Sequence, residues 1–314
     1  MNFYFHSGFA RDIQAMLELK SALGHKSGSY GWNLTNFDRF CQDKFPDESV
    51  LTKELAFSWC DQVNSDNKSG YRMHAIREFG KYLVSIGKEA FIFPSELLPS
   101  HKAELPYIFS DEELINFFKA TDKVPKCAKS PLLEYTVPVI FRLQYGCGMR
   151  PQEVRLLKRI NFDFSNNTIY ISESKWCKDR RLAVTDDLMD LCRRYDAIAD
   201  MIIPDRTFFF QSPNGNAYMH GWLTSKFHQC WNRSGNGNEK SPSTPYDFRH
   251  NFATQTLMRW VEEGKDLNVY IPYMSAYMGH SSFNSTYYYV HLLPERLSKM
   301  DFTHAEGIIP EVTP

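Results

Sequence analysis

A set of polar residues in the second half of the chain has the types needed to cleave a phosphodiester. Each of them lies at a turn or at the end of an apolar segment. They are Arg150, Arg249, His280 and Tyr289. Arginine donates two parallel hydrogen bonds to a phosphate and stays charged at any working pH. A tyrosine hydroxyl can act as a nucleophile that forms a covalent intermediate. Cleavage without a metal ion needs such groups and, in addition, an acid for the departing hydroxyl.

Each of these residues taken alone has a more ordinary interpretation. A lone arginine is more often a surface residue than a phosphate ligand, and a histidine after a glycine can bond to the backbone of its turn. Three successive tyrosines, 287–289, can be aromatic packing, because adjacent residues of a helix point in different directions. Lys175 and Lys178, at the end of a predicted hairpin, would usually serve only solubility.

The elements that must position these residues divide into two predicted domains. The first hundred residues favour a helical bundle, because apolar residues recur at intervals of three and four. The connector at about 93–106 contains three prolines, which exclude a continuous helix, and polar residues that suit an exposed linker. We therefore expect a helical domain over residues 1–106 and a second domain over residues 107–314, with a tail from about residue 292.

The second domain combines helices with a few short strands. Ser110 and Glu113 have the spacing of a capping box, which predicts a helix through about Thr121. Pro151 suits the first position of another helix, after a turn that two glycines allow. Alternating patterns predict short strands at 160–164, 168–171 and 182–184, and helices resume from about residue 186. The expected fold class is mainly α with a small antiparallel β-sheet, α+β.

Composition describes an ordinary globular protein, with 43% hydrophobic and 23% charged residues among 314. No apolar run reaches the roughly 20 residues that a bilayer requires, and the N-terminus lacks the pattern of a secretory signal. We therefore expect no membrane association and a cytoplasmic location. The seven cysteines form no CxxC pair and no metal-binding spacing, which favours reduced thiols.

Charge is unevenly distributed along the chain. The net charge of −1 gives no global argument for nucleic-acid binding. Residues 142–181, however, hold nine basic and four acidic residues, a surplus of five. A basic surface confined to this segment is therefore compatible with a neutral whole, although such clusters also arise by chance on solvated faces.

Taken in order, four motifs resemble the tyrosine recombinase (phage integrase) family. They are GMRPQEV at 148–154, the lysine hairpin, YDFRHNFA at 246–253 and MGHSSFNSTYYYVH at 278–291. The last motif is the most specific, and the resemblance covers about residues 107–295. Less sharply, residues 1–105 resemble the helical core-binding domain of that family. The resemblance implies a C-shaped clamp of two domains around double-stranded DNA.

The family's roles carry over to individual positions of this chain. Arg150 and Arg249 would hold the scissile phosphate, and Tyr289 would attack it. His280 would be a further donor to the phosphate. Lys175 would protonate the leaving 5′ oxygen, and Lys178 is the fallback, because the register of a hairpin slips easily. Two more residues are supporting candidates: Glu153, which would form an ionic hydrogen bond beside the first arginine, and His250, which follows the second.

One position departs from the family. Where the family usually has histidine, three residues before the second arginine, this chain has Tyr246. A phenol with an ordinary pKa of about 10 is a poor proton acceptor at neutral pH. We interpret Tyr246 as a hydrogen-bond donor to a phosphate oxygen, with the proton of Tyr289 passing to the phosphate or to water. The alternative is that Tyr246 only packs against its neighbours.

The resemblance also implies a reaction and an assembly. Tyr289 would form a 3′-phosphotyrosyl bond that a second strand reverses, in site-specific recombination or integration, as expected of a mobile element. We expect no metal and no nucleotide cofactor, in keeping with the absence of HExxH and GxxxxGK[ST] motifs. A homotetramer on two DNA sites, with dimer intermediates, is implied for a cytoplasmic, nucleoid-associated enzyme. The tail from Leu292 either packs onto a neighbouring copy or is disordered.

Two other functions remain open on the sequence alone. A type IB topoisomerase would use the same chemistry within a monomer to relax DNA, although the length and two-domain layout favour a recombinase. A DNA-binding regulator could retain the fold after losing catalysis, and Tyr246 is the feature that would favour it. The presence of both arginines, Lys175, His280 and Tyr289 argues against that alternative.

Overall fold

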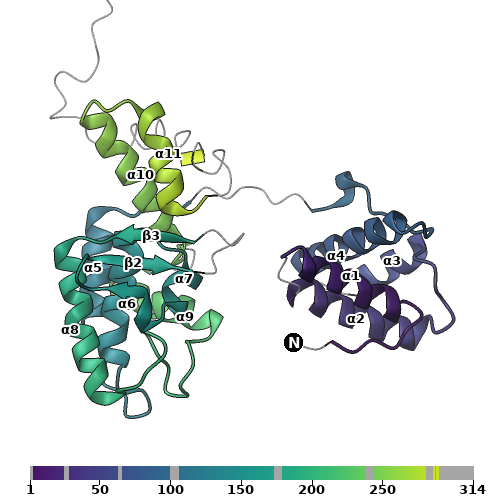
Figure 1. The fold of residues 1–314 in the computed structure, drawn as a ribbon, viewed down its shortest axis with the longest axis horizontal. Helices are drawn as coiled ribbons and strands as arrows, with labels where there is room; N and C mark the ends of the chain where they lie inside the picture. The colour runs from purple at the N-terminus through teal and green to yellow at the C-terminus, as the bar shows by residue number, and fades with distance from the viewer. Residues whose placement is uncertain are drawn as a thin grey trace, which may run out of the picture. The chain divides into compact units, whose positions relative to one another are not determined.

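The computed structural model describes residues 3–24, 28–62, 66–99, 106–172, 179–237, 243–280, 286 and 288–289. The chain divides into two compact units, residues 1–104 and residues 105–314 (Figure 1). Each unit has a hydrophobic core of its own.

The first unit consists of helices around an aromatic core. Its elements are α1 (Ala10–Ala22), α2 (Gly28–Lys44), α3 (Lys53–Cys60), α4 (Asp66–Ser85) and the short 3-10 turn η1 (Ser95–Leu97). Phe37 lies at the centre, with ring centroids 5.3 Å from Trp59 and 6.2 Å from Phe79. Phe93, which the sequence places at the start of an exposed linker, is fully buried in this core. The core of the first unit therefore reaches further along the chain than the proline pattern indicates.

The second unit contains the remaining helices and the strands. In chain order these are α5 (Asp111–Thr121), α6 (Leu133–Cys147), α7 (Pro151–Leu156), η2 (Arg159–Asn161), β1 (Phe162–Asp163), β2 (Thr168–Ile171), β3 (Arg180–Ala183), α8 (Asp186–Ile202), α9 (His220–Arg233), α10 (Asp247–Glu262) and α11 (Leu267–Met278). The capping box of α5 is confirmed, since Glu113 N donates to Ser110 Oγ at 3.2 Å and Ser110 N donates to Glu113 Oε2 at 2.8 Å.

The strands form one antiparallel sheet in the order β1-β2-β3. Ile169 pairs with Leu182, and Ile171 pairs with Arg180. Because side chains alternate along a strand, Arg180 lies on the same face as the buried Leu182, while Arg181 lies on the other face. The expected fold class, mainly helical with a small antiparallel sheet, is confirmed. The strands are shorter than the sequence pattern predicts at 160–164, where η2 replaces the first residues.

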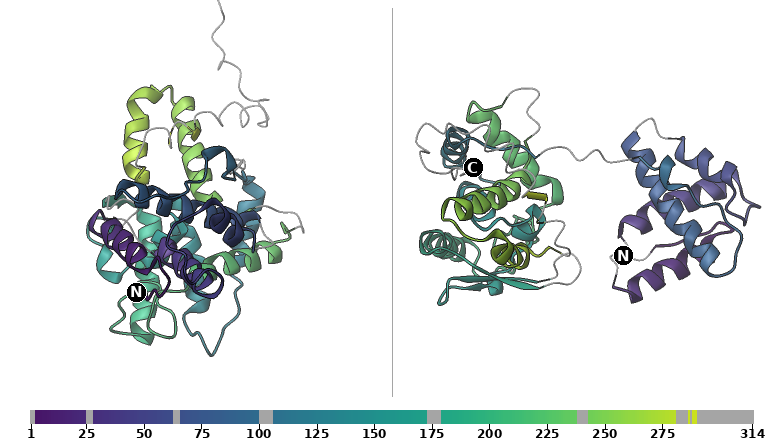
Figure 2. Two further views of the ribbon diagram at one scale, coloured as in Figure 1. Left: turned by 90° about the vertical axis from the view of Figure 1, so that its right-hand side faces the viewer. Right: turned by 90° about the horizontal axis from the view of Figure 1, so that it is seen from above.

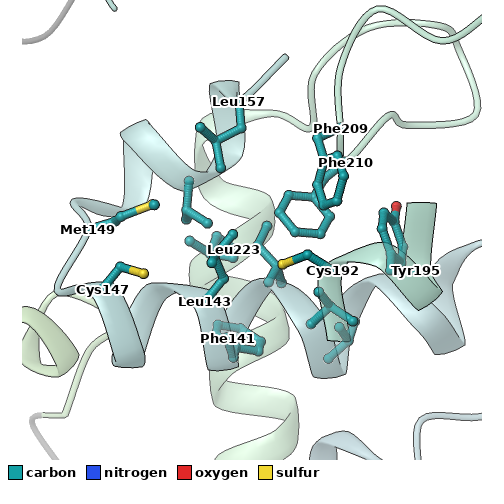
Figure 3. Packing of buried hydrophobic residues seen from close by; sticks show 14 of the residues in the cluster. Phe141, Leu143, Cys147, Met149, Leu157, Cys192, Tyr195, Phe209, Phe210 and Leu223 are labelled. Carbon is teal, nitrogen blue, oxygen red and sulfur yellow. The ribbon is translucent and has the colours of Figure 1, made fainter. Parts of the chain in front are cut away.

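Helix α6 runs through the core of the second unit. Figure 3 shows Leu143 and Cys147 of α6 among side chains of α8, α9 and the segment 209–210. Met149 is fully buried next to Arg150, and Phe248 is fully buried next to Arg249. Each of these core residues therefore fixes the backbone beside one candidate arginine, because a well-packed side chain cannot shift without opening a cavity.

Helices α10 and α11 lie side by side (Figures 1 and 2). They share a separate small core with Tyr289, formed by Ala253, Leu257, Met258, Ile271, Met274 and Met278. Pairing of these two helices brings the start of α10 close to the end of α11. Among the residues that the structure describes, no helix combines the length and the apolar character that crossing a membrane requires.

Candidate active site

Arg150 lies at the turn between α6 and α7. Gly148 ends α6 with a φ of 58°, in the left-handed region that favours glycine, and an added Cβ there would meet the ring of Phe252 at 2.5 Å. The guanidinium of Arg150 donates from Nη1 to Glu153 Oε1 at 2.6 Å and from Nη2 to the carbonyl oxygen of Gly279 at 2.9 Å. The turn therefore directs Arg150 toward the end of α11.

Arg249 lies in the first turn of α10, and only 1% of its surface is exposed. Its Nη1 donates to the Gly148 carbonyl at 2.9 Å, and its Nη2 donates to the Met278 carbonyl at 2.6 Å. Its Nε is buried and has no hydrogen-bond partner among the described residues. Burial lowers the pKa of Arg249 to about 10, with the charge of Arg150 acting in the same direction. The guanidinium is therefore still positive at neutral pH and retains an unused donor.

A third arginine reaches the same helix end. Arg180, at the start of β3, donates from Nε to the Tyr277 carbonyl at 2.7 Å. Three arginines thus bond to successive carbonyls at the C-terminal end of α11: those of Tyr277 and Met278 in the helix and that of Gly279, its C-cap residue. The C-terminal end of a helix carries partial negative charge, so it suits cations. These contacts fix the backbone that leads into His280.

Glu153 is the carboxylate that links Arg150 and Arg180. Arg180 donates to it from Nη1 at 3.0 Å and from Nη2 at 2.8 Å, and Arg150 N donates to Oε2 at 2.9 Å. Burial by itself would raise the pKa of the Glu153 carboxyl, but the hydrogen bonds and charges of Arg180 and Arg150 outweigh it and lower that pKa to about 2. A fixed negative charge therefore offsets part of the repulsion between the arginines.

His280 directly follows the helix end that the arginines hold. Its Nδ1 lies 2.7 Å from Thr286 Oγ1. Burial and then the positive charges of neighbouring arginines, first among them Arg249, lower the pKa of His280 to about 3. The imidazole is therefore neutral at physiological pH, and it can donate one hydrogen bond while its other nitrogen accepts one.

Tyr289 packs next to His280 and is only 3% exposed. The two rings are nearly parallel, with an interplanar angle of 17° and centroids 6.1 Å apart. The ring of His250 lies 5.5 Å away on the side of α10. Burial raises the pKa of the Tyr289 phenol to about 12, against the opposing charge of Arg249.

Tyr246 and His250 lie at the N-terminal end of α10, which also carries Arg249. Their ring centroids are 5.1 Å apart, and Tyr246 is 42% exposed. His250 is largely buried, and its Nδ1 atom has no hydrogen-bond partner among the described residues. Phenol and imidazole thus lie side by side at the start of α10, four residues apart in sequence.

The profile of a family described as "Phage integrase family" matches residues 110–296. The chain belongs to this family. It is a tyrosine recombinase, an enzyme that transfers DNA strands. The chain is 26% identical over 330 residues to the tyrosine recombinase XerC of Chlamydia caviae, which covers 96% of this chain and 98% of XerC. It is 28% identical to y4rB of Sinorhizobium fredii, provisionally named an integrase/recombinase, over 93% of this chain and 96% of y4rB.

Solved structures of recombinases share the fold of this chain. XerH bound to a palindromic difH substrate superposes with a TM-score of 0.61 at 19% identity, over 88% of this chain and 79% of XerH. A lambda integrase dimer bound to a COC′ core site superposes with a TM-score of 0.60 at 12% identity, over 96% and 99% of the two chains. These matches agree with the expected fold class, which is mainly helical with a small antiparallel sheet.

In this recombinase most of the sequence-predicted site residues lie together. Those that the structure brings to one place are Arg150, Glu153, Tyr246, Arg249, His250, His280 and Tyr289. Lys175 and Lys178 lie outside the described residues. Arg180 was missed as a site residue and counted only as part of the basic surplus. Strand alternation could have indicated Arg180, because a residue two positions before the buried Leu182 lies on the same face of β3. A charged side chain on a buried face needs a partner.

Proposed function

We propose that this recombinase cleaves DNA by attack of the Tyr289 hydroxyl on a backbone phosphorus atom. A bond forms between the phenolic oxygen and phosphorus, the bond from phosphorus to the 5′ oxygen breaks, and a 3′-phosphotyrosyl link results. The 5′ hydroxyl of another strand then displaces the tyrosine and completes strand exchange. Because the covalent link retains the energy of the broken bond, rejoining needs no ATP.

The unused donor of Arg249 is the observation that carries the proposal. A buried N–H group without a hydrogen-bond partner costs about 1–3 kcal/mol of folding free energy. Because the guanidinium of Arg249 is positively charged, an anion would be a favourable partner for this group. Arg150 is held beside it by bonds to neighbouring carbonyls of α11, with the ring of Tyr289 close by. A phosphate that accepted from both guanidinium groups would therefore meet the phenol.

The remaining residues supply donors and protons in this proposal. His280, neutral and fixed at the end of α11, donates to a non-bridging oxygen of the phosphate. Tyr246, which is partly exposed beside the arginines, donates a second hydrogen bond through its hydroxyl. Lys175 protonates the leaving 5′ oxygen, with Lys178 as the other candidate. Glu153 keeps the arginines oriented through the bonds described above.

A nicked suicide substrate tests the nucleophile. Such a substrate loses a short strand after cleavage, so the covalent protein–DNA adduct accumulates and can be resolved by denaturing electrophoresis. Tyr289→Phe should abolish the adduct, whereas the matched variants Tyr287→Phe and Tyr288→Phe should retain it. An adduct that persists in Tyr289→Phe, or that forms only with added magnesium, would contradict the proposal.

We propose that the partner is double-stranded DNA. The lambda integrase structure contains a dimer on a core site. In our proposal, recombination between two sites brings together two such dimers of this chain. Sedimentation of the protein with two duplexes should yield four protomers for two duplexes. A single protomer on each duplex would favour relaxation of DNA within a monomer, as a type IB topoisomerase performs it.

We further propose that the enzyme serves a mobile element and acts on DNA in the cytoplasm, at the nucleoid. The Tn1549 transposon integrase, whose structure superposes with a TM-score of 0.60 at 16% identity, supports the first part through the shared fold. Transfer of a marked DNA segment between two plasmids in cells tests it. Relaxation of supercoiled plasmid without any segment transfer would argue for a different role.

A further inference from the structure

Among the histidines that the structure describes, His250 has the ring nearest to that of the proposed nucleophile. Its centroid is 5.5 Å from that of Tyr289, compared with 6.1 Å for His280. It also contacts Tyr246, the N-cap residue of α10 four positions earlier, with centroids 5.1 Å apart. The start of α10 therefore places an imidazole next to Tyr289 although position 246 itself carries a phenol.

Attack by a tyrosine requires that its proton be removed. Burial raises the pKa of the Tyr289 phenol to about 12, so at pH 7 only about one molecule in 10⁵ would carry the free phenolate. A neighbouring base that accepts the proton during attack avoids this penalty. The base must be uncharged at working pH and must have a nitrogen lone pair that is not already used.

The other candidates at this place meet these requirements less well. His280 is a weak base because its pKa is lowered to about 3, and its Nδ1 already shares a hydrogen bond with Thr286 Oγ1 at 2.7 Å. A neutral Tyr246 phenol has no basic nitrogen. His250, in contrast, has a buried Nδ1 without a hydrogen-bond partner among the described residues.

We infer that His250 accepts the phenolic proton of Tyr289 during strand cleavage and returns it during rejoining. This rests on the proposed role of Tyr289 as nucleophile. As the oxygen–phosphorus bond forms, the proton moves from the phenol to an imidazole nitrogen, and the leaving 5′ oxygen takes a separate proton from the lysine acid. In rejoining, the imidazolium protonates the departing phenolate oxygen, and the attacking 5′ hydroxyl returns its proton to the lysine. The histidine that the family usually has at position 246 is thus replaced from the next turn of the same helix.

The surroundings of His250 determine how its role depends on pH. Burial lowers its pKa below the ordinary value, Asp247 opposes this effect and Arg249 adds to it. In the part of the chain that the structure describes, the titratable and charged groups around it are Tyr246, Asp247, Arg249, His280, Tyr288 and Tyr289. His250 is therefore neutral at pH 7 and can accept a proton. As pH falls through its lowered pKa, His250 becomes protonated and cleavage should slow.

Chemical rescue of a cavity variant tests the inference. In single-turnover cleavage of the suicide substrate, His250→Ala should bind DNA as the natural protein does but cleave about 10²- to 10⁴-fold more slowly. Added imidazole should restore part of the rate, and substituted imidazoles should restore more as their basicity rises. His220→Ala, which removes an exposed histidine at the start of α9, is the matched control and should not respond to imidazole.

A second variant separates proton transfer from packing. Tyr246→His should make His250 dispensable, so that the double variant Tyr246→His, His250→Ala cleaves much faster than His250→Ala alone. A substrate with sulfur in place of the leaving 5′ oxygen needs no acid, so it should rescue loss of the lysine and should not rescue loss of His250. If His250→Ala does not fold, His250→Gln should show the same loss of the acidic limb of the pH–rate profile.

The outcomes are distinguishable from failure of the proposed function. An adduct in Tyr289→Phe would overturn the nucleophile itself. If Tyr289→Phe is inactive but His250→Ala cleaves at the natural rate, only the role of His250 is overturned. A slow His250→Ala that shows no response to the basicity of added imidazoles and an unchanged pH profile would likewise overturn it.

Discussion

Arg180 donates two hydrogen bonds to the carboxylate of Glu153, at 3.0 and 2.8 Å, from a strand 27 residues further along the chain. Both side chains are nearly buried, and the same guanidinium also bonds to the carbonyl of Tyr277 at 2.7 Å. Arg180 therefore joins three elements, α7, β3 and α11, at the point from which Arg150 and His280 project. From these contacts we infer that Arg180 positions the residues of the proposed site.

Removal of Arg180 should affect both folding and cleavage. Arg180→Met removes one of the two guanidinium groups that pair with the buried carboxylate of Glu153. This loss should lower the free energy of unfolding by about 3 kcal/mol. Arg181→Met is the matched control, since that neighbouring side chain is 63% exposed and should change stability by less than about 0.5 kcal/mol. Urea unfolding and single-turnover cleavage measure the two effects. Equal stability of both variants would refute the positioning role.

The pKa of Glu153 predicts a pH dependence of stability. Its folded-state pKa of about 2 lies below the unfolded value of about 4.3, so the unfolded state binds more protons in this interval. The resulting stability, roughly 3 kcal/mol, is fully present above pH 4.3 and is lost as pH falls toward 2. In Glu153→Gln this component of the acid transition should be absent. Denaturant unfolding of both proteins between pH 5 and 2.5 checks it.

Gly279 should tolerate a side chain less well than another glycine of the same backbone conformation. Its φ is 65°, and an added Cβ would lie 2.9 Å from Arg180 Nη1. Gly264 has a φ of 67° with nothing within 4 Å, so Gly264→Ala carries only the backbone cost of about 1 kcal/mol. Gly279→Ala should be destabilised by about 1 kcal/mol more and should cleave more slowly. Comparable thermal midpoints for the two variants would show that Arg180 gives way freely.

Tyr246→Phe separates hydrogen bonding from packing at position 246. The phenyl ring keeps the contact with His250, at 5.1 Å between centroids, but removes the hydroxyl. If Tyr246 donates to a phosphate oxygen, the cleavage rate should fall about tenfold or more, while stability and DNA affinity change little. Unchanged cleavage by Tyr246→Phe would assign the residue to packing alone.

Much of the fold could be predicted from the sequence because local rules determine it. The capping box at Ser110 and Glu113, the helix after Pro151 and the alternating strand near Ile169 are all set by residues close in sequence. The extent of the first core was harder to predict. Phe93 directly precedes Pro94 and the polar residues of the connector, and its packing against Phe57 and Phe91 shows that it belongs to the core.

Part of the site has no signature in residue types. The arginines bond to backbone carbonyls at the C-terminal end of α11. Because every residue has a backbone carbonyl, no sequence pattern predicts these contacts. The position of His250 beside Tyr289 depends on how α10 packs against α11, which motif spacing does not specify. Arg180 could have been singled out from its place on the buried face of β3, had alternation been applied to charged residues as well as apolar ones.

The hydrogen bonds from three arginines to the C-terminal end of α11 have a consequence for the enzyme in the absence of DNA. Clustered guanidinium groups would ordinarily drive each other apart, but here a carboxylate and the negative end of a helix compensate for them. In the absence of DNA the protein therefore depends on Glu153 and the C-terminal end of α11 to limit the repulsion between these arginines. Raising the ionic strength should weaken its encounter with the double helix while leaving the architecture of the empty enzyme intact.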